Sequence, residues 1–244
     1  MDTGSELIWV QCEDCQKRNK CFGNPPDFFK NTKSNSYNPI PSDTQRLCYL
    51  GKCINDFCSY ITHYADEFTA EGILAFETFT FGNGPRQNDI TGESMIYNLI
   101  FGCNRYFSGP DHMKHTIGLL GLGWGDWGPK SLMSQIKTQI EDIFSYCFPH
   151  YDESAIDVQG YLKLGLEGNL EDGFSSTALL QFEDSDYYYL NLEVISVNNK
   201  KFPILSSVFI RKNNDEGGTI IDSGNAFTDL TPRAYKVLNK TMLA

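Results

Sequence analysis

Asp2-Thr3-Gly4-Ser5 opens the chain, and Asp222-Ser223-Gly224-Asn225 repeats its pattern near the other end. Each stretch sets a carboxylate beside a hydroxyl residue and a glycine, and apolar residues that can anchor it in a core lie next to it. A single stretch of this kind is most often an ordinary turn. Two of them with matching apolar flanks, 220 residues apart, predict one site built from two related halves of the molecule.

Asp2 and Asp222 are the candidate catalytic residues, because two neighbouring carboxyl groups can activate water. Like charges at short range cannot both ionise, so the pKa of one group falls, the pKa of the other rises, and the pair shares a proton. The ionised group takes a proton from a water held between them, and the protonated group donates to an amide carbonyl, with about 10²–10⁴ in rate from each step. The pattern predicts hydrolysis of a peptide bond with the catalytic water as the only cofactor.

The neighbours of the two aspartates have assignable supporting roles. Gly4 and Gly224 let backbone amides approach the carboxylates, which a side chain would obstruct. The Ser5 hydroxyl can donate to the first aspartate and keep it ionised. Thr3 and Ser223 can hydrogen-bond across the two halves and hold the loops against each other.

The composition favours a folded, strand-rich protein. Of the 244 residues 41% are hydrophobic and 14% aromatic, and 21 glycines and 10 prolines suit strands and turns better than helices. The net charge of -11 argues against binding to a nucleic-acid backbone, which needs a basic face, and fits a protein that works in acid. No apolar run approaches the roughly 20 residues of a membrane span, and no signal peptide is present.

Eight cysteines lie at positions 12, 15, 21, 48, 53, 58, 103 and 147. Their clustering in a loop-rich region indicates disulfides and an oxidising compartment. The alternative is a structural zinc site, since Cys12 and Cys15 have the spacing of a ligand pair, although no second pair of this spacing accompanies them. His112 and His115 form a lone histidine pair that we expect in a surface loop, so no metal is predicted.

The hydrophobic pattern predicts an all-β architecture with short helices. Residues 13–58 are polar, turn-rich and rich in cysteine, which indicates an irregular loop region. Strands are expected at residues 60–64, 73–81, 98–101, 117–123, 144–147, 160–165, 187–197, 201–204 and 219–221, with a hairpin-like turn at 82–84. One helix is expected near residues 132–140. Thr231 is expected to cap a second helix with Pro232 at its first position and with Tyr235 and Leu238 facing inward.

These motifs together resemble the pepsin-like aspartic proteases, specifically their plant nepenthesin-like branch, over essentially the whole chain. Residues 2–10 match the first active-site loop of that family and residues 220–224 match the second. Residues 58–66 match the hairpin flap that closes over substrate, which places the flap tyrosine at Tyr64 and its hydrogen-bonding tryptophan at Trp9. The framework stretches 101–103 and 117–122 also match, and the cysteine-rich insert before the flap marks the plant branch.

The resemblance implies a bilobal, all-β, pepsin-like fold with short helices and an incomplete second lobe. The N-terminal lobe is expected at residues 1–165, the connection at 166–180 and the partial C-terminal lobe at 181–244. Three disulfides are implied as well. They pair Cys12 with Cys15, Cys21 with Cys103, and Cys48 with Cys58, and they leave Cys53 and Cys147 over.

The chain departs from the family pattern in four places. It begins at the first loop and ends soon after the second, so the strand that leads into Asp2 and the rest of the second lobe are expected to be missing. Asn225 replaces the usual threonine or serine. The flap tip at residues 64–68 lacks the glycines that usually follow the tyrosine, and this bulkier, more acidic turn is expected to alter substrate entry.

Two main hypotheses follow from these observations. The first is an aspartic endopeptidase that cuts polypeptides in acid beside apolar residues, acting as a monomer without a nucleic-acid or membrane partner; the partial second lobe predicts little activity. The second is a catalytically inactive relative that binds and inhibits cell-wall-degrading glycosidases. An incomplete gene product without an independent role is the third alternative. The sequon at Asn239 and Thr241 adds weak support for a secreted or vacuolar location.

Overall fold

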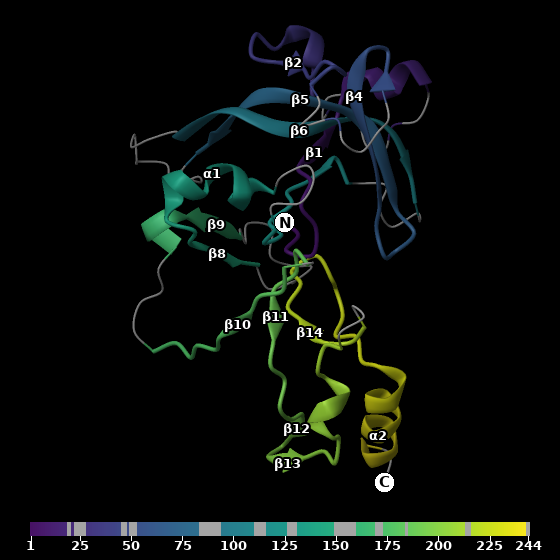
Figure 1. Ribbon diagram of the computed structural model, residues 1–244, viewed down its shortest axis with the longest axis vertical. Helices are drawn as coiled ribbons and strands as arrows, with labels where there is room; N and C mark the ends of the chain where they lie inside the picture. The colour runs from purple at the N-terminus through teal and green to yellow at the C-terminus, as the bar shows by residue number, and fades with distance from the viewer. Residues whose placement is uncertain are drawn as a thin grey trace, which may run out of the picture.

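The computed structural model describes residues 1–18, 21, 28–44, 48, 53–82, 94–109, 116–125, 131–148, 160–168, 173–183, 185–212 and 216–242. The described residues between 1 and 168 make up the upper part of the molecule in Figure 1, here called the N-terminal part, and those between 173 and 242 make up the lower, C-terminal part. The N-terminus lies between the two parts, and the C-terminus lies at the far end of the C-terminal part. The first Asp loop is therefore placed at the junction.

A seven-stranded sheet dominates the N-terminal part, with the strand order β3-β4-β5-β6-β1-β7 and with β2 paired to β5. Its strands are β1 (Trp9–Gln11), β2 (Asn38–Pro39), β3 (Cys53–Ile54), β4 (Phe57–His63), β5 (Thr69–Phe81), β6 (Ser94–Ser108) and β7 (Gly118–Leu119). β4, β5 and β6 form an antiparallel meander, whereas β1 runs parallel to β6. The strands predicted at 60–64 and 73–81 are confirmed in place.

β6 is much longer than the four residues predicted at 98–101. The polar residues Asn104 and Arg105 interrupt the hydrophobic pattern, so the sequence did not predict a strand there. The pairing of β6 with β5 nevertheless continues past these residues. Gly72 makes the close approach possible, because a Cβ there would lie 2.2 Å from the carbonyl oxygen of Cys103. The Arg105 guanidinium is neutralised by Asp14 at 3.2 Å.

Two hydrophobic clusters pack within the N-terminal part. One contains Ile8, Phe101, Leu122 and the buried face of helix α1 (Leu132–Ile140), and the other contains Trp9, Tyr60, Phe68 and Phe107. α1 forms where it was predicted, because its apolar residues recur at helical spacing and the Ser131 hydroxyl accepts a hydrogen bond from the Ser134 amide.

The remaining pieces of the N-terminal part are short. β8 (Phe144–Cys147) and β9 (Tyr161–Leu164) pair as an antiparallel ribbon, close to the predicted ranges. Short 3₁₀ helices occupy Glu13–Arg18, Asn31–Lys33 and Gly165–Gly168. The described part of the cysteine-rich segment 13–58 is irregular, as predicted, apart from these turns, β2, β3 and the first two residues of β4.

The C-terminal part has less regular structure than predicted. β10 (Leu179–Leu180), β11 (Tyr189–Leu190) and β14 (Thr219–Ile220) form a small sheet, and β12 (Ser196–Val197) pairs with β13 (Lys200–Lys201). The long strand predicted at 187–197 is broken into β11 and β12, and the one at 201–204 is reduced to the end of β13. A 3₁₀ turn follows at Ser206–Val208, before β14.

Helix α2 (Pro232–Met242) closes the C-terminal part and begins at Pro232 as predicted. Its Ala234 is fully buried in a small cluster with Phe202, Ile204 and Phe209. The prediction that Tyr235 faces inward is wrong, because this side chain is 56% exposed and Ala234 takes the inner position instead. In the described residues no helix is long and apolar enough to cross a membrane.

Two of the three expected disulfide pairings are wrong. Cys12 is bonded to Cys103 and Cys15 to Cys21, whereas the expected pairs joined Cys12 to Cys15 and Cys21 to Cys103. Cys12 directly follows β1, which runs parallel to β6 and pairs Val10 with Cys103. The Cα atoms of Cys12 and Cys103 are therefore only 5.4 Å apart, a spacing that a disulfide bridges.

The third pairing, Cys48 with Cys58, is present as expected. Cys147 is free and exposed, and the side chain of Cys53 lies outside the described residues, as do His112, His115 and the turn at 83–84. Because Cys12 and Cys15 are both in disulfides, the zinc alternative is excluded at that pair.

Candidate active site

The first Asp loop is held by the glycine-rich segment after β7. The Asp2 amide donates to the Leu120 carbonyl at 3.0 Å, and the Leu122 amide donates to the Asp2 carbonyl at 2.8 Å. Gly121 allows this approach, because a Cβ there would lie 2.2 Å from the Glu6 carbonyl oxygen. The glycines in the apolar segment 117–123 thus allow the first Asp loop to pack closely against this segment.

The Asp2 side chain is buried and well supplied with donors. Its Oδ1 accepts the Gly4 amide at 2.9 Å, and its Oδ2 accepts the Ser5 hydroxyl. Burial raises the pKa of Asp2, the hydrogen bonds from Ser5 and Gly4 lower it, and the Asp222 carboxyl raises it again. Ser5 therefore occupies the predicted place, as a donor to Asp2.

The second Asp loop follows β14 and brings Asp222 against the first loop. The Gly224 amide donates to Asp222 Oδ1 at 2.7 Å. A Cβ on Gly4 would lie 2.4 Å from Asp222 Oδ2, and a Cβ on Gly224 would lie 2.3 Å from Asp2 Oδ1. Each glycine thus faces the carboxylate of the opposite loop, and two aspartates 220 residues apart meet at one place.

Thr3 and Ser223 join the two loops directly. The Thr3 amide donates to Ser223 Oγ at 3.1 Å, and the Ser223 amide donates to Thr3 Oγ1 at 2.9 Å. Ser223 Oγ also donates to the Met1 carbonyl at 3.3 Å. The reciprocal pair crosses the junction, which is the arrangement that the sequence pattern predicted for these two residues.

Tyr64 lies at the base of the β4–β5 turn and accepts a hydrogen bond from Trp9. The indole Nε1 is 2.9 Å from the Tyr64 hydroxyl, and the Tyr64 ring stacks on Phe68 with centroids 4.9 Å apart. Burial raises the pKa of Tyr64, with a further increase from the charge of Asp2, so the phenol stays neutral near the dyad.

The tip of this turn closes without glycine. The Tyr64 amide donates to the Phe68 carbonyl at 2.8 Å, and Glu67 adopts a left-handed conformation with φ of 66°. The Asp66 carboxylate accepts the Phe68 amide at 3.3 Å, which stabilises the turn. Residues 65–67 are exposed, so the tip presents two acidic side chains to solvent.

Asn225 is directed along its own loop. Its Nδ2 donates to Asp229 Oδ2 at 2.6 Å, and its Oδ1 accepts the Phe227 amide at 3.3 Å. Within the described residues the hydrogen bonds of Asn225 are thus made to residues 227 and 229. Both of its side-chain polar atoms are engaged there, away from the loop of Asp2.

Glu6 and Asp186 are site residues that the sequence interpretation missed. The two carboxyl groups lie within hydrogen-bonding reach of each other; burial, the hydrogen bond and the charge of Asp186 together raise the pKa of Glu6 to about 9. Glu6 directly follows the first Asp motif and so carried a signal. Asp186 carried none, because only the fold brings it to the junction.

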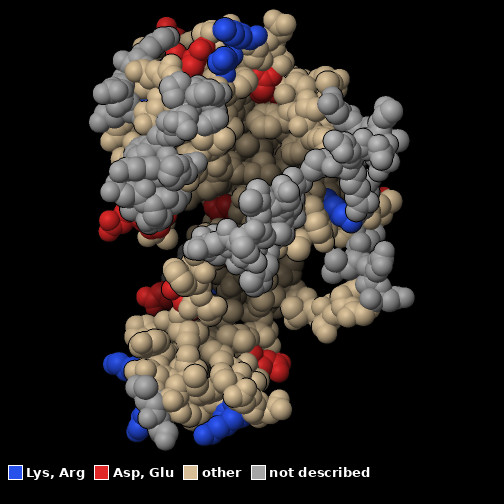
Figure 2. Space-filling view, turned by 180° about the vertical axis from the view of Figure 1, so that it is seen from behind, with Lys and Arg blue, Asp and Glu red and all other residues tan. Residues whose placement is uncertain are grey.

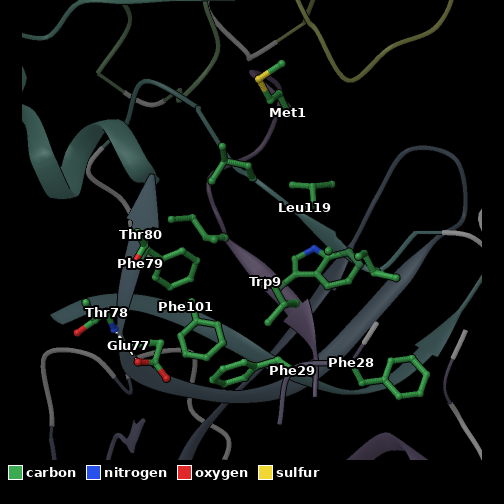
Figure 3. A pocket seen from close by; sticks show the side chains of 15 residues that line it. Met1, Trp9, Phe28, Phe29, Glu77, Thr78, Phe79, Thr80, Phe101 and Leu119 are labelled. Atoms are coloured by element: carbon green, nitrogen blue, oxygen red, sulfur yellow. Dashed lines mark hydrogen bonds between the residues drawn. The ribbon is translucent and has the colours of Figure 1, made fainter. Parts of the chain in front are cut away.

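A separate apolar pocket of about 580 Å³ lies in the N-terminal part, and Figure 3 shows Trp9, Phe101 and Phe29 around it. Glu77 is the acidic residue that lines it. Its carboxylate already accepts the hydroxyls of Ser34 and Ser36 and the Thr78 amide. This pocket therefore offers packing surface, whereas the acid–base groups gather at the junction of the two parts.

Metal ligands are not clustered in the part of the chain that the structure describes, where no group of three or more His, Cys, Asp or Glu side chains is placed to hold an ion.

The comparison with protein families agrees with this geometry. Residues 1–166 match the family model described as xylanase inhibitor N-terminal, and residues 187–244 match the one described as xylanase inhibitor C-terminal. The chain belongs to the pepsin-like aspartic protease family, as the resemblance implied.

Plant members of the pepsin-like family share about a third of the sequence. The chain is 36% identical to aspartic proteinase nepenthesin-2 of Nepenthes gracilis over 98% of the chain and 50% of that protein. It is 33% identical to nepenthesin-1 of the same plant, over 100% of the chain and 52% of that protein. It is 34% identical to aspartic proteinase PCS1 of Arabidopsis thaliana, also over 100% of the chain and 52% of that protein. The chain spans about half the length of these relatives.

A solved pepsin-like structure supports the fold. The crystal structure of EDGP superposes with a TM-score of 0.64 at 17% identity, over 98% of this chain and 61% of that one. The expected pepsin-like, mostly β fold is therefore confirmed, with part of the bilobal architecture represented in this chain.

Proposed function

We propose that this chain carries the site of an aspartic endopeptidase, in which a water between Asp2 and Asp222 attacks a peptide bond. The observation that supports the proposal most is the meeting of the two carboxylates across Gly4 and Gly224. The side chains of Asp2 and Asp222 are within hydrogen-bonding reach of each other. Two carboxyl groups so placed share a proton, so one is available as a base and the other as an acid. Relatives named as aspartic proteinases agree with this chemistry.

The proton transfers follow from this arrangement. The ionised carboxylate takes a proton from the water as the water oxygen bonds to the peptide carbonyl carbon, and the protonated carboxyl donates its proton to the carbonyl oxygen. When the tetrahedral intermediate collapses, the carbon–nitrogen bond breaks and the nitrogen receives the proton that the first carboxylate took from the water. The second carboxyl regains its proton from a hydroxyl of the intermediate, so the pair returns to its starting state. The amides of Gly4 and Gly224 hold the carboxylates in position through these steps.

The substrate we propose is a polypeptide that reaches the junction of the two parts. Seen from behind, the surface is hollowed between them, with acidic side chains on both edges of the hollow (Figure 2). The three disulfides support an oxidising location, secreted or vacuolar. No cofactor besides the catalytic water is proposed.

The direct test is hydrolysis of a denatured protein in acid by the purified chain and by its Asp222→Asn variant. We expect the wild type to cut slowly, since the partial second lobe predicts little activity, and we expect a transition-state mimic with a hydroxyl in place of the scissile carbonyl to block the cutting. Asp222→Asn is expected to lower the rate by at least about 10²-fold, because the pair can no longer divide acid and base roles.

Asp43→Asn is the matched control, since Asp43 is exposed in a turn of the N-terminal part and lies outside the site. Its rate is expected to equal that of the wild type. Absence of hydrolysis by the wild type would reject the endopeptidase proposal, and an active Asp222→Asn variant would reject the dyad.

A second candidate function is binding without catalysis, and the orientation of Asn225 favours it. Its amide pairs with Asp229 and both of its polar atoms are engaged within its own loop, where the family pattern has a hydroxyl residue. The matching family models are described by xylanase inhibition, so an endo-xylanase is the probe to use. Stoichiometric inhibition of the xylanase together with no proteolysis would select this function.

A further inference from the structure

A second carboxyl pair lies at the junction of the two parts, beside the dyad but distinct from it. We propose that Glu6 and Asp186 share one proton and, through it, act as positioning residues that hold the two Asp loops together. The inference rests on the proposed function, because it gives the pH range over which that same site stays assembled.

The backbone around Asp186 is fixed against the N-terminal part. The Trp124 amide donates to the Asp186 carbonyl at 2.7 Å, and the Tyr188 hydroxyl donates to the Leu122 carbonyl at 2.7 Å. The rings of Trp124 and Tyr188 contact each other with centroids 5.2 Å apart. Residues 186–188 therefore run along residues 122–124 and form part of the contact between the two parts.

The Asp186 side chain is inserted into this contact without a donor. Its Oδ1 is buried and has no hydrogen-bond partner among the described residues. Gly125 leaves the room for it, because a Cβ there would lie 1.0 Å from that oxygen. A buried carboxylate without a donor is costly, and a proton on the Glu6 carboxyl, which lies within hydrogen-bonding reach of Asp186, would offset that cost.

The described charged groups that act on Glu6 and on the neighbouring Tyr187 are acidic. Arg105 is paired with Asp14, and Lys212 is paired with Glu216. Tyr187 lies beside the pair, and its pKa is raised by burial, by Tyr189 and by the charges of Glu6, Asp222 and Asp186. The surroundings are acidic, which favours a shared proton over two ionised carboxylates.

Each member of the pair is linked through a neighbouring residue to one of the two Asp loops. Glu6 follows Ser5, whose hydroxyl donates to Asp2. On the other side, the Tyr188 carbonyl accepts the Ile221 amide at 3.0 Å, and Ile221 precedes Asp222. Repulsion between Glu6 and Asp186 would therefore move the two catalytic loops apart, so their shared proton supports the dyad without touching substrate.

The direction of the pH effect follows from the raised pKa of Glu6. Its ordinary pKa is 4.5 and its value in the fold is about 9. A carboxyl whose pKa is raised on folding stabilises the fold fully below its unfolded pKa and loses that contribution as pH rises to its folded pKa. The junction is thus expected to be tight in acid and to loosen progressively between these two values.

The experiment measures amide hydrogen exchange at Trp124 and Ser223, whose amides donate across the junction, and needs no catalysis. Protection factors, corrected for the intrinsic pH dependence of exchange, are compared between pH 4.5 and pH 8. We expect the wild type to lose about tenfold or more in protection, since one pKa unit corresponds to a factor of ten. Glu6→Gln is expected to lose less than about twofold, because its amide donates to Asp186 without a titrating proton.

Glu6→Ala and Glu193→Gln complete the design. Glu6→Ala removes the donor and is expected to show low protection at both pH values, whereas Glu193→Gln, an exposed carboxyl of the C-terminal part, should follow the wild type. A Glu6→Gln profile that superimposes on the wild type would overturn the proposal. If protection behaves as expected but the chain cuts no protein, the positioning pair stands and the endopeptidase proposal fails.

Discussion

At the scale of single residues, the site depends on two missing side chains as much as on two carboxylates. Gly224 faces Asp2 so closely that a Cβ would lie 2.3 Å from Oδ1, and Gly4 has the reciprocal position opposite Asp222. A side chain at either glycine would separate the two carboxyl groups. The dyad could then no longer hold one water between them.

Gly224→Ala tests this dependence. We expect at least about a 10²-fold loss of peptidase rate, since displacements near 1 Å in a catalytic geometry have effects of that size. Gly82→Ala is the matched control, because a Cβ on Gly82 meets nothing within 4 Å. Steady-state hydrolysis of a protein substrate measures both variants, and an unimpaired Gly224→Ala variant would contradict the close approach of the loops.

Sequence reasoning identified the residues with a repeated local motif, and it failed where only the fold creates the neighbourhood. Asp2, Ser5, Thr3 and Ser223 make the contacts predicted from the two loops. Asp186 could not be found, because its partner is 180 residues away along the chain. The disulfides of Cys12 and Cys15 could not be derived either, since cysteine spacing does not determine connectivity.

At the scale of elements, the β4–β5 hairpin is linked to the first Asp loop through one aromatic hydrogen bond. Trp9 in β1 donates from Nε1 to the Tyr64 hydroxyl at 2.9 Å, and its ring packs near Phe68 and Phe107 at centroid distances of 5.6 and 6.0 Å. The hairpin position is therefore coupled to the strand that continues from the dyad loop.

Trp9→Phe removes this donor and keeps an aromatic ring in the core. We expect a fall in kcat/KM together with a loss of more than roughly 1 kcal/mol in unfolding free energy, because the fully buried position loses a hydrogen bond and the smaller ring also leaves a cavity. Tyr64→Phe removes the same bond from the other side, so the double variant should cost less than the sum of the two single variants. Additive effects in this double-mutant cycle would show that the two residues act independently.

The elements that sequence predicted best are those with a strong local pattern. β5 and α1 formed in place because their apolar residues recur at strand and helix spacing. The prediction of one long strand at 187–197 is wrong. Within this range, β11 pairs with β10 and β14 and β12 pairs with β13, and the residues between β11 and β12 are in no strand. Strand extent is decided by the pairing partner, which the local sequence does not contain.

At the scale of the whole molecule, the two parts are joined by a small set of polar contacts around the dyad. The reciprocal pair of Thr3 and Ser223, the Trp124 amide on Asp186 and the Tyr188 hydroxyl on Leu122 all cross the junction. The C-terminal part has its own cluster around Phe202 and Ala234. Cooperative unfolding of the two parts therefore depends on these contacts more than on a shared core.

Thr3→Val tests this dependence, because it removes the acceptor of the Ser223 amide and keeps the shape of the side chain. A buried amide left without an acceptor costs about 1–3 kcal/mol, so we expect the C-terminal part to unfold at a lower temperature, in a transition separate from that of the N-terminal part. Differential scanning calorimetry in acid measures both transitions.

Thr241→Val is the matched control, because it makes the same chemical change within α2. The Thr241 hydroxyl donates to the Val237 carbonyl at 2.8 Å, and this bond does not cross the junction. A Thr3→Val variant that melts in one transition at the temperature of the Thr241→Val variant would show that the reciprocal pair does not couple the two parts.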